Sequence, residues 1–220
     1  RQYHMAHHAR TWTRDDPDLN LAQPFPVTRD SLRRKIWRDL SGQTGWKRVK
    51  YTLMRDLGLR RGKMARTHES MRAFRGMLIT NGVLLGGLWL LGHPALYLLW
   101  VAAFLTTNML VTRIRAIAEH SMVTDPSSPL QNTRTTRANA LERLLVAPNR
   151  VNYHLEHHLL MTVPHYKLPE MHELLRARGA LEGANVADGS GEVLRRASST
   201  GRDEDAPVRH TSAHHPRPFF

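Results

Sequence analysis

The sequence predicts an all-α protein: an integral membrane helical hairpin with a cytosolic helical cap that carries clustered histidines. Three observations predict this fold. Residues 76–112 contain no Asp, Glu, Lys or Arg. The segments on either side of this stretch are rich in Lys and Arg. Two H-x-x-H-H patterns lie outside it, and their spacing places three imidazoles on one face of a helix.

The uncharged stretch is too long for a single membrane span. As one straight helix its 37 residues would extend about 55 Å, whereas the hydrocarbon core is about 30 Å thick. Gly92-His93-Pro94 interrupts it near the middle, because Pro cannot continue a helix and Gly favours a helix end. We therefore expect two short spans joined by a tight turn. The alternative is a buried helical hairpin in a soluble protein.

The charge distribution supports the membrane hairpin. The formal net charge is +13, and fourteen Lys or Arg residues against three acidic ones lie between Arg33 and Arg75. Arg113 and Arg115 follow the second span. Because basic residues gather on the cytoplasmic side of membrane proteins, both flanks are expected in the cytosol. A basic chain can also bind nucleic acid, but the long uncharged stretch argues against that class, and we expect no nucleic-acid partner.

Two amphipathic helices are expected before the hairpin. Leu32, Ile36 and Leu40 share one helical face, and a second stripe with this spacing runs from Trp46 to Leu57. Lys and Arg flank each stripe. Such helices either lie along the membrane surface with their cations at the lipid headgroups, or pack within a cytosolic cap. The sequence leaves both interpretations open.

The segments after the hairpin complete the expected domain. A turn-rich loop at 125–129 precedes helical segments near 139–146 and 164–178, and the polar composition from 183 onward is typical of disorder. We thus predict one domain over residues 1–178 and a disordered tail over 183–220. Within the domain, the hairpin covers about 76–112 and the cap covers 1–75 and 113–178.

Seven histidines outside the hairpin are candidate metal ligands. They are His4, His7 and His8 in the first pattern, His154, His157 and His158 in the second, and His120 after the second span. The chain has no cysteine, so any metal must be held by nitrogen or oxygen. Imidazole suits iron, zinc, copper and nickel alike. It binds metal in its neutral form, so occupancy should fall below about pH 6.5.

Several other polar residues are not predicted to bind metal directly. His165 and His172 are expected to be structural, and the histidines at 210, 214 and 215 are not expected to be ligands, because their segment is rich in Pro and lacks apolar framing. Glu119 either orients a ligand or is simply solvated.

The motifs together resemble the membrane fatty acid desaturase family over roughly residues 1–175. The resemblance rests on H-x-x-H-H near Asp-Asp-Pro-Asp at 15–18, on Arg-x-Arg-x-x-x-Glu-His ending at His120, and on Asn-Tyr-His-Leu-Glu-His-His followed by Val-Pro-His-Tyr-Lys-Leu-Pro. It implies two iron ions in a cytosolic cap. The residues at 4, 7 and 8 match the second histidine box of the family, those at 154, 157 and 158 the third, and His120 an additional ligand.

Two features depart from the family pattern. The first histidine box, H-x(3 or 4)-H, is absent, and the chain begins at Arg1 and not at Met, so we expect further residues to precede it. Ala116 stands where some relatives carry an Asn, which puts a water-mediated ligand there in doubt. Seven protein ligands are fewer than two iron ions are expected to need. The chain alone is therefore expected to be inactive and to hold fewer than two irons.

The resemblance implies an oxidoreductase of lipid metabolism that desaturates a fatty acyl lipid or acyl thioester. It would use oxygen and an external electron donor of the ferredoxin or cytochrome b5 type, at a site on the cytosolic face of the membrane. Breaking an unactivated C–H bond is beyond acids, bases and nucleophiles, which agrees with a redox metal. Two alternatives stay open: a hydroxylase or ketolase on the same scaffold, and a non-enzymatic, metal-poor membrane relative.

Overall fold

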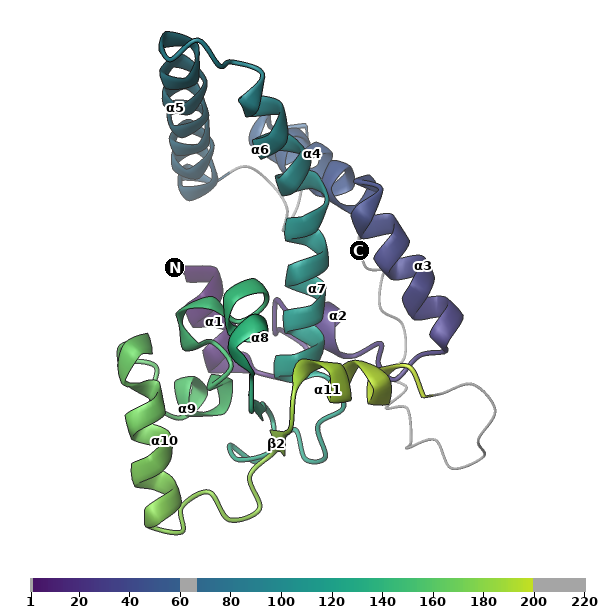
Figure 1. The fold of residues 1–220 in the computed structure, drawn as a ribbon, viewed down its shortest axis with the longest axis vertical. Helices are drawn as coiled ribbons and strands as arrows, with labels where there is room; N and C mark the ends of the chain where they lie inside the picture. The colour runs from purple at the N-terminus through teal and green to yellow at the C-terminus, as the bar shows by residue number, and fades with distance from the viewer. Residues whose placement is uncertain (1, 60–66, 200–220) are drawn as a thin grey trace. The chain divides into compact units, whose positions relative to one another are not determined.

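The structure, a computed structural model, describes residues 2–59 and 67–199. This part of the chain is mostly helical, as predicted, with one pair of two-residue strands (Figure 1). The α-helices are α1 (Gln2–Arg10), α2 (Leu19–Ala22), α3 (Arg29–Leu40), α4 (Gln43–Asp56), α5 (His68–Leu90), α6 (Leu96–Leu105), α7 (Thr107–His120), α8 (Ala140–Leu145), α9 (His154–Leu159), α10 (Leu168–Ala177) and α11 (Ser190–Ala197). The strands are β1 (Thr135–Thr136) and β2 (Val186–Ala187), and the 3₁₀ helices are η2 (Pro148–Arg150) and η3 (His165–Lys167).

The described residues form two compact units. One contains residues 2–34 and 111–199, and the other contains 35–59 and 67–110. The second unit groups α4 with α5 and α6, whereas the sequence predicts residues 35–75 in the same cap as the histidines. All seven candidate ligands lie in the first unit.

The apolar stretch forms a helical hairpin, α5 followed by α6. Helix α5 begins at a capping box in which Thr67 and Ser70 exchange hydrogen bonds. The turn after it places Gly92 at a φ of +78°, which a residue with a Cβ rarely adopts. In the described part of the chain, two helical segments are long and apolar enough to cross a membrane, His68–Leu90 and Leu96–His120. The break predicted at Gly92-His93-Pro94 is confirmed.

The second apolar segment is not one regular helix. Helix α6 ends at Leu105 and α7 begins at Thr107, because Thr106 departs from helical geometry with φ −117° and ψ −84°. The Thr106 hydroxyl donates to the carbonyl of Ala102 at 2.6 Å, a local bond that often bends helices. Helix α4 approaches this point closely. A Cβ on Gly45 would lie 2.3 Å from the Leu105 carbonyl oxygen, so only glycine fits there.

The two amphipathic segments before the hairpin are helical, as predicted. Gly42, at φ +76°, separates α3 from α4. Leu32 is buried, whereas Trp37 and Trp46 have 67% and 61% of their surface exposed. These helices thus present large apolar side chains to their surroundings.

The first unit is organised around short backbone pairings between distant segments. Strand β1 pairs in parallel with β2, and Thr135 forms an isolated bridge with Tyr153, directly before α9. Ile117, Leu155 and Val193 are completely buried and come from α7, α9 and α11. Two of these three helices also carry candidate ligands, since His120 lies on α7 and the second histidine triad lies on α9.

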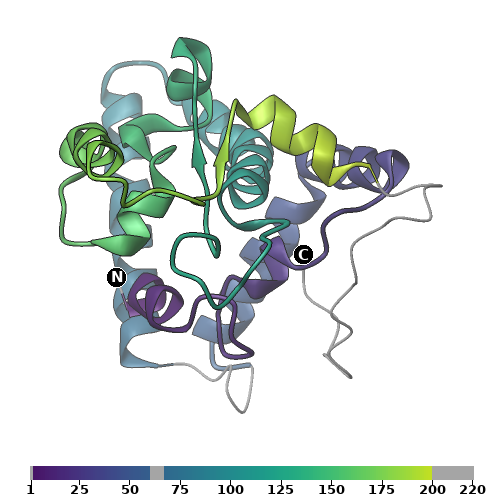
Figure 2. The ribbon, with the colours of Figure 1, turned by 90° about the horizontal axis from the view of Figure 1, so that it is seen from below.

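The prediction of a disordered tail from residue 183 is wrong for residues 186–197. Strand β2 and helix α11 occupy this segment, and α11 is the yellow helix that follows β2 in Figures 1 and 2. Val193 and Ala197, four residues apart on one face of α11, are both buried. Two buried side chains amid Gly, Ser and Arg make too weak a pattern to predict a helix from the sequence. Residues 200–220, including the three histidines at 210, 214 and 215, lie outside the described residues.

Candidate metal centre

Three helices supply the seven histidines. Helix α1 carries the first H-x-x-H-H pattern and α9 carries the second, so the i, i+3, i+4 spacing does place each triad on one helical face. His120 is the last residue of α7. The structure brings all seven side chains together, in two adjacent groups that each draw on more than one helix.

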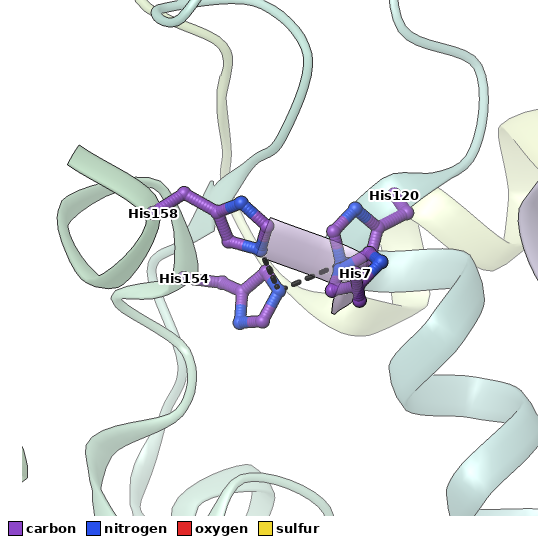
Figure 3. Close-up of side chains that lie close together, drawn as sticks. All are labelled: His7, His120, His154 and His158. Carbon is purple, nitrogen blue, oxygen red and sulfur yellow. Dashed lines mark hydrogen bonds between the residues drawn. The ribbon is translucent and has the colours of Figure 1, made fainter. Parts of the chain in front are cut away.

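The four-histidine group is mostly buried, with His158 half-buried, and it combines all three helices: His7, His120, His154 and His158 (Figure 3). The Nε2 atoms of His7 and His120 are 3.2 Å apart, and those of His120 and His154 are 2.7 Å apart. His158 Nε2 lies 3.1 Å from His154 Nε2. In Figure 3 the rings turn these nitrogens toward a common point.

The three-histidine group is more exposed and combines α1 with α9. It consists of His4, His8 and His157. Its Nε2 atoms form a nearly equilateral triangle, with 3.1 Å between His4 and His157, 3.1 Å between His8 and His4, and 3.0 Å between His8 and His157. The two groups touch, because the rings of His8 and His158 stack with centroids 4.0 Å apart.

These distances fit nitrogens that share a cation better than nitrogens that bond to one another. A neutral imidazole Nε2 is either a donor or an acceptor, so a triangle of three Nε2 atoms cannot close with three hydrogen bonds. At least one pair of like groups, two lone pairs or two N–H groups, would face each other. Nitrogens about 2.0–2.1 Å from a divalent ion, at right angles to one another, are about 3 Å apart. The donor set therefore fits a metal ion in each group.

Comparison with known proteins agrees with this geometry. The family model described as Fatty acid desaturase matches residues 1–189, which include both histidine triads and His120. The chain belongs to the fatty acid desaturase family. It is also 34% identical over 87 residues to the Dihydrorhizobitoxine desaturase of Bradyrhizobium elkanii, an alignment that covers 39% of this chain and 25% of that protein. No solved structure matches the chain.

Several imidazoles of this desaturase-family chain favour the neutral form that binds metal. Burial, together with the nearby histidines His157, His4 and His7, lowers the pKa of His8 to about 4. Burial and the other imidazoles lower the pKa of His154 and of His158 well below the ordinary value. These groups therefore stay uncharged at neutral pH, with a lone pair available for a cation.

His7 is oriented by a buried carboxylate from the Asp-Asp-Pro-Asp run. Asp16 Oδ1 lies 2.8 Å from His7 Nδ1, and Asp16 also accepts from the main-chain NH groups of Trp12 and Asp18. Burial raises the pKa of Asp16, but these hydrogen bonds lower it by more, so it falls below its ordinary value. An ionised Asp16 accepts from Nδ1–H and leaves Nε2 of His7 directed at the group, as is common for metal-binding histidines.

A second buried carboxylate supports helix α9 and was not singled out in the sequence. Glu156 is 1% exposed and stands between His154 and His157 in the third box. His172 Nδ1, on α10, lies 2.6 Å from Glu156 Oε1, and the Thr135 hydroxyl donates to Glu156 Oε2. His172 thus contacts a carboxylate, outside both histidine groups, in agreement with its expected structural role. The signal available in the sequence was an acidic residue inside a histidine box.

Glu119 lies at the edge of the four-histidine group. Arg115 Nε donates to Glu119 Oε1 at 3.0 Å, and Glu119 Oε2 is 3.9 Å from His154 Nε2. The side chain is 12% exposed, so of the two interpretations the structure favours a residue that neighbours the candidate ligands over a solvated one.

A polar cavity of about 380 Å³ opens beside the two stacked rings. Its walls include His8 and His158 from the two groups, and Thr11 and Asn132 from the surrounding loops. Solvent or a small molecule can thus approach the site from this side.

Proposed function

We propose that this protein carries out the oxygen-dependent desaturation of a fatty acyl chain at a pair of iron ions, using electrons from an external donor. The observation that carries this proposal is the convergence of seven imidazoles into two touching groups, in a chain that belongs to the fatty acid desaturase family. In the overall reaction, two hydrogens leave adjacent carbons as the double bond forms. With O₂, two electrons and two protons they yield two water molecules.

The two groups divide the ligands between the ions. The four-histidine group would hold one iron and the three-histidine group the other. When bound, the irons supply the redox chemistry that activates oxygen, which amino-acid side chains cannot supply. Because one group offers a fourth imidazole and is more buried, we expect tight binding there and weaker binding at the three-histidine group. This difference agrees with the expectation that the chain holds fewer than two irons.

The protein's own residues prepare the ligands. Asp16 holds His7 in the tautomer that exposes Nε2, and the pair formed by Glu156 and His172 holds α9, which carries three ligands. Burial of His154 and His158 keeps them neutral. These contacts support a site whose ligands are positioned before metal arrives.

We further propose that α5 and the segment from Leu96 place the hairpin, about residues 76–112, in the membrane, with the cap of residues 1–75 and 113–178 on the cytosolic face. The exposure of apolar side chains supports this, since Leu90 is 93% exposed and Trp89 74%. The exposed Trp37 and Trp46 also support placing α3 and α4 at the lipid headgroups.

The partners follow from the proposed reaction. The substrate would be a fatty acyl lipid or an acyl thioester, and the electron donor would be of the ferredoxin or cytochrome b5 type. The match to the Dihydrorhizobitoxine desaturase spans one quarter of that protein's length. A hydroxylase or ketolase on the same scaffold is the second candidate, because the same ligands would serve oxygen insertion.

Iron titration tests the metal site. The detergent-purified chain, titrated with Fe(II) without oxygen, should show one tight and one weaker class of site. His120→Ala should remove the tight class and His4→Ala the weaker one, while the exposed His165→Ala should change neither. A chain that binds no iron, or whose two histidine variants bind iron like the parent, would contradict the assignment and support a non-enzymatic relative.

Product analysis tests the reaction. The intact protein, supplied with an acyl substrate, oxygen and a reducing donor, should yield an acyl chain two mass units lighter, whereas the present chain alone is expected to be inactive. A product sixteen mass units heavier would identify a hydroxylase instead.

A further inference from the structure

The guanidinium of Arg134 is completely buried and is bonded to a helix end. Arg134 is 0% exposed. Its Nη1 donates to the carbonyls of Ile117 at 3.5 Å and Ala118 at 3.0 Å, and its Nη2 donates to those of Ser121 at 2.8 Å and Met122 at 3.3 Å. These four carbonyls belong to the last turn of α7 and to the residues that leave it.

The nature of these acceptors is unusual for a buried charge. Buried arginines are normally paired with carboxylates or phosphates. In the described part of the chain this guanidinium is instead bonded to main-chain carbonyls and to the side-chain oxygen of Asn185, at 3.0 Å from Nε. The last carbonyls of an α-helix lack partners within the helix and carry partial negative charge. Burial lowers the pKa of Arg134 to about 10, so it remains charged at neutral pH.

The helix end that Arg134 holds is the one that presents His120. This histidine lies between the bonded carbonyls of Ala118 and Ser121. Its Nδ1 is buried without a hydrogen-bond partner among the described residues, whereas Nδ1 of His7 is held by Asp16. No hydrogen bond at Nδ1 from a described residue therefore orients the His120 ring. Its Nε2 reaches His7 and His154 because the end of α7 is held in place.

We propose that Arg134 is the positioning residue for His120: it fixes the C-terminal turn of α7 so that this ligand meets the other imidazoles of the four-histidine group. This inference rests on the proposed metal site. Asn185 assists from the segment next to β2, since it holds Nε of Arg134 while β1, which follows Arg134 directly, pairs with β2. The segment at 185–187 is thereby coupled to the metal site although it supplies no ligand.

The test compares Arg134→Gln with Arg137→Gln in the full chain. Both changes remove one guanidinium from the same segment, but Arg137 is an exposed residue paired with Asp188. In anaerobic Fe(II) titrations, Arg134→Gln should weaken the tight site about 10- to 100-fold, the usual effect of losing a residue that orients a ligand. The weaker, three-histidine site should keep its affinity, and Arg137→Gln should match the parent at both sites.

A spectroscopic measurement separates positioning from general stability. With Co(II) in place of iron, the visible absorption of the tight site should shift in Arg134→Gln, and Arg134→Lys should not restore it, because an ammonium lacks the planar fork. A residue needed only for stability would lower the melting temperature and leave the spectrum of the folded protein unchanged.

Three outcomes decide the matter. Parent-like affinity and spectrum in folded Arg134→Gln would overturn the inference and leave the proposed function intact. Failure of the proposed function would appear in the parent chain, as the absence of a tight site. If Arg134→Gln does not fold, Asn185→Ala decides, because it removes a single bond. It should weaken only the tight site, and no change there would overturn the inference.

Discussion

The contact between Asp16 and His7 offers the most direct test of ligand preparation. Asp16→Asn keeps the shape of the side chain, and with its oxygen at Oδ1 it can still accept from His7 Nδ1 and from the NH of Asp18. This acceptor is neutral instead of charged, and the NH of Trp12 loses its acceptor at Oδ2. Hydrogen bonds to charged groups contribute about 1.5–3 kcal/mol and neutral ones about 0.5–1.5 kcal/mol. The exchange thus costs about 1–2 kcal/mol, which corresponds to about 5- to 30-fold weaker binding at the tight site.

The assay is competition for Fe(II) with a chelator at pH 8. Burial lowers the pKa of His7, and the hydrogen bond and charge of Asp16 raise it by more, so it lies above the ordinary value. Alkaline pH therefore keeps proton competition at His7 small. The matched control is Asp15→Asn, an adjacent and exposed carboxylate that should leave the affinity unchanged. Equal affinities for the two variants would refute the view that Asp16 prepares His7.

Three further predictions concern packing and support. Gly45→Ala should lower the melting temperature of the detergent-purified chain, because the new Cβ would lie 2.3 Å from the Leu105 carbonyl oxygen and overpacking costs about 1–3 kcal/mol. The control Gly86→Ala has open space around its Cβ and should leave the melting temperature unchanged. Asn81→Leu should destabilise the hairpin by about 0.6–2 kcal/mol in the same melting measurement, since two side chains of α6 donate to its Oδ1. Glu156→Ala should weaken iron binding at both groups in the titration, because α9 contributes ligands to each; an effect confined to melting temperature would contradict that role.

The sequence by itself determined the features that depend on local geometry. A stretch without charges, interrupted by Gly92 and Pro94, predicts two apolar helices whatever surrounds it, and the structure contains them. The spacing of His154, His157 and His158 places three imidazoles on one face, because the helix repeat alone sets that angle. The family resemblance followed from the same motifs, and the match over residues 1–189 confirms it.

Only the tertiary structure decided how those parts combine. Adjacent histidines in one motif enter different groups, His7 with His120 and His8 with His157, because neighbouring residues on a helix point about 100° apart and face different partners. The sequence likewise gives no sign that Arg134 binds the end of α7, or that Val193 lies in the core. Such contacts join residues far apart in the chain, and their energies depend on burial that no local pattern encodes.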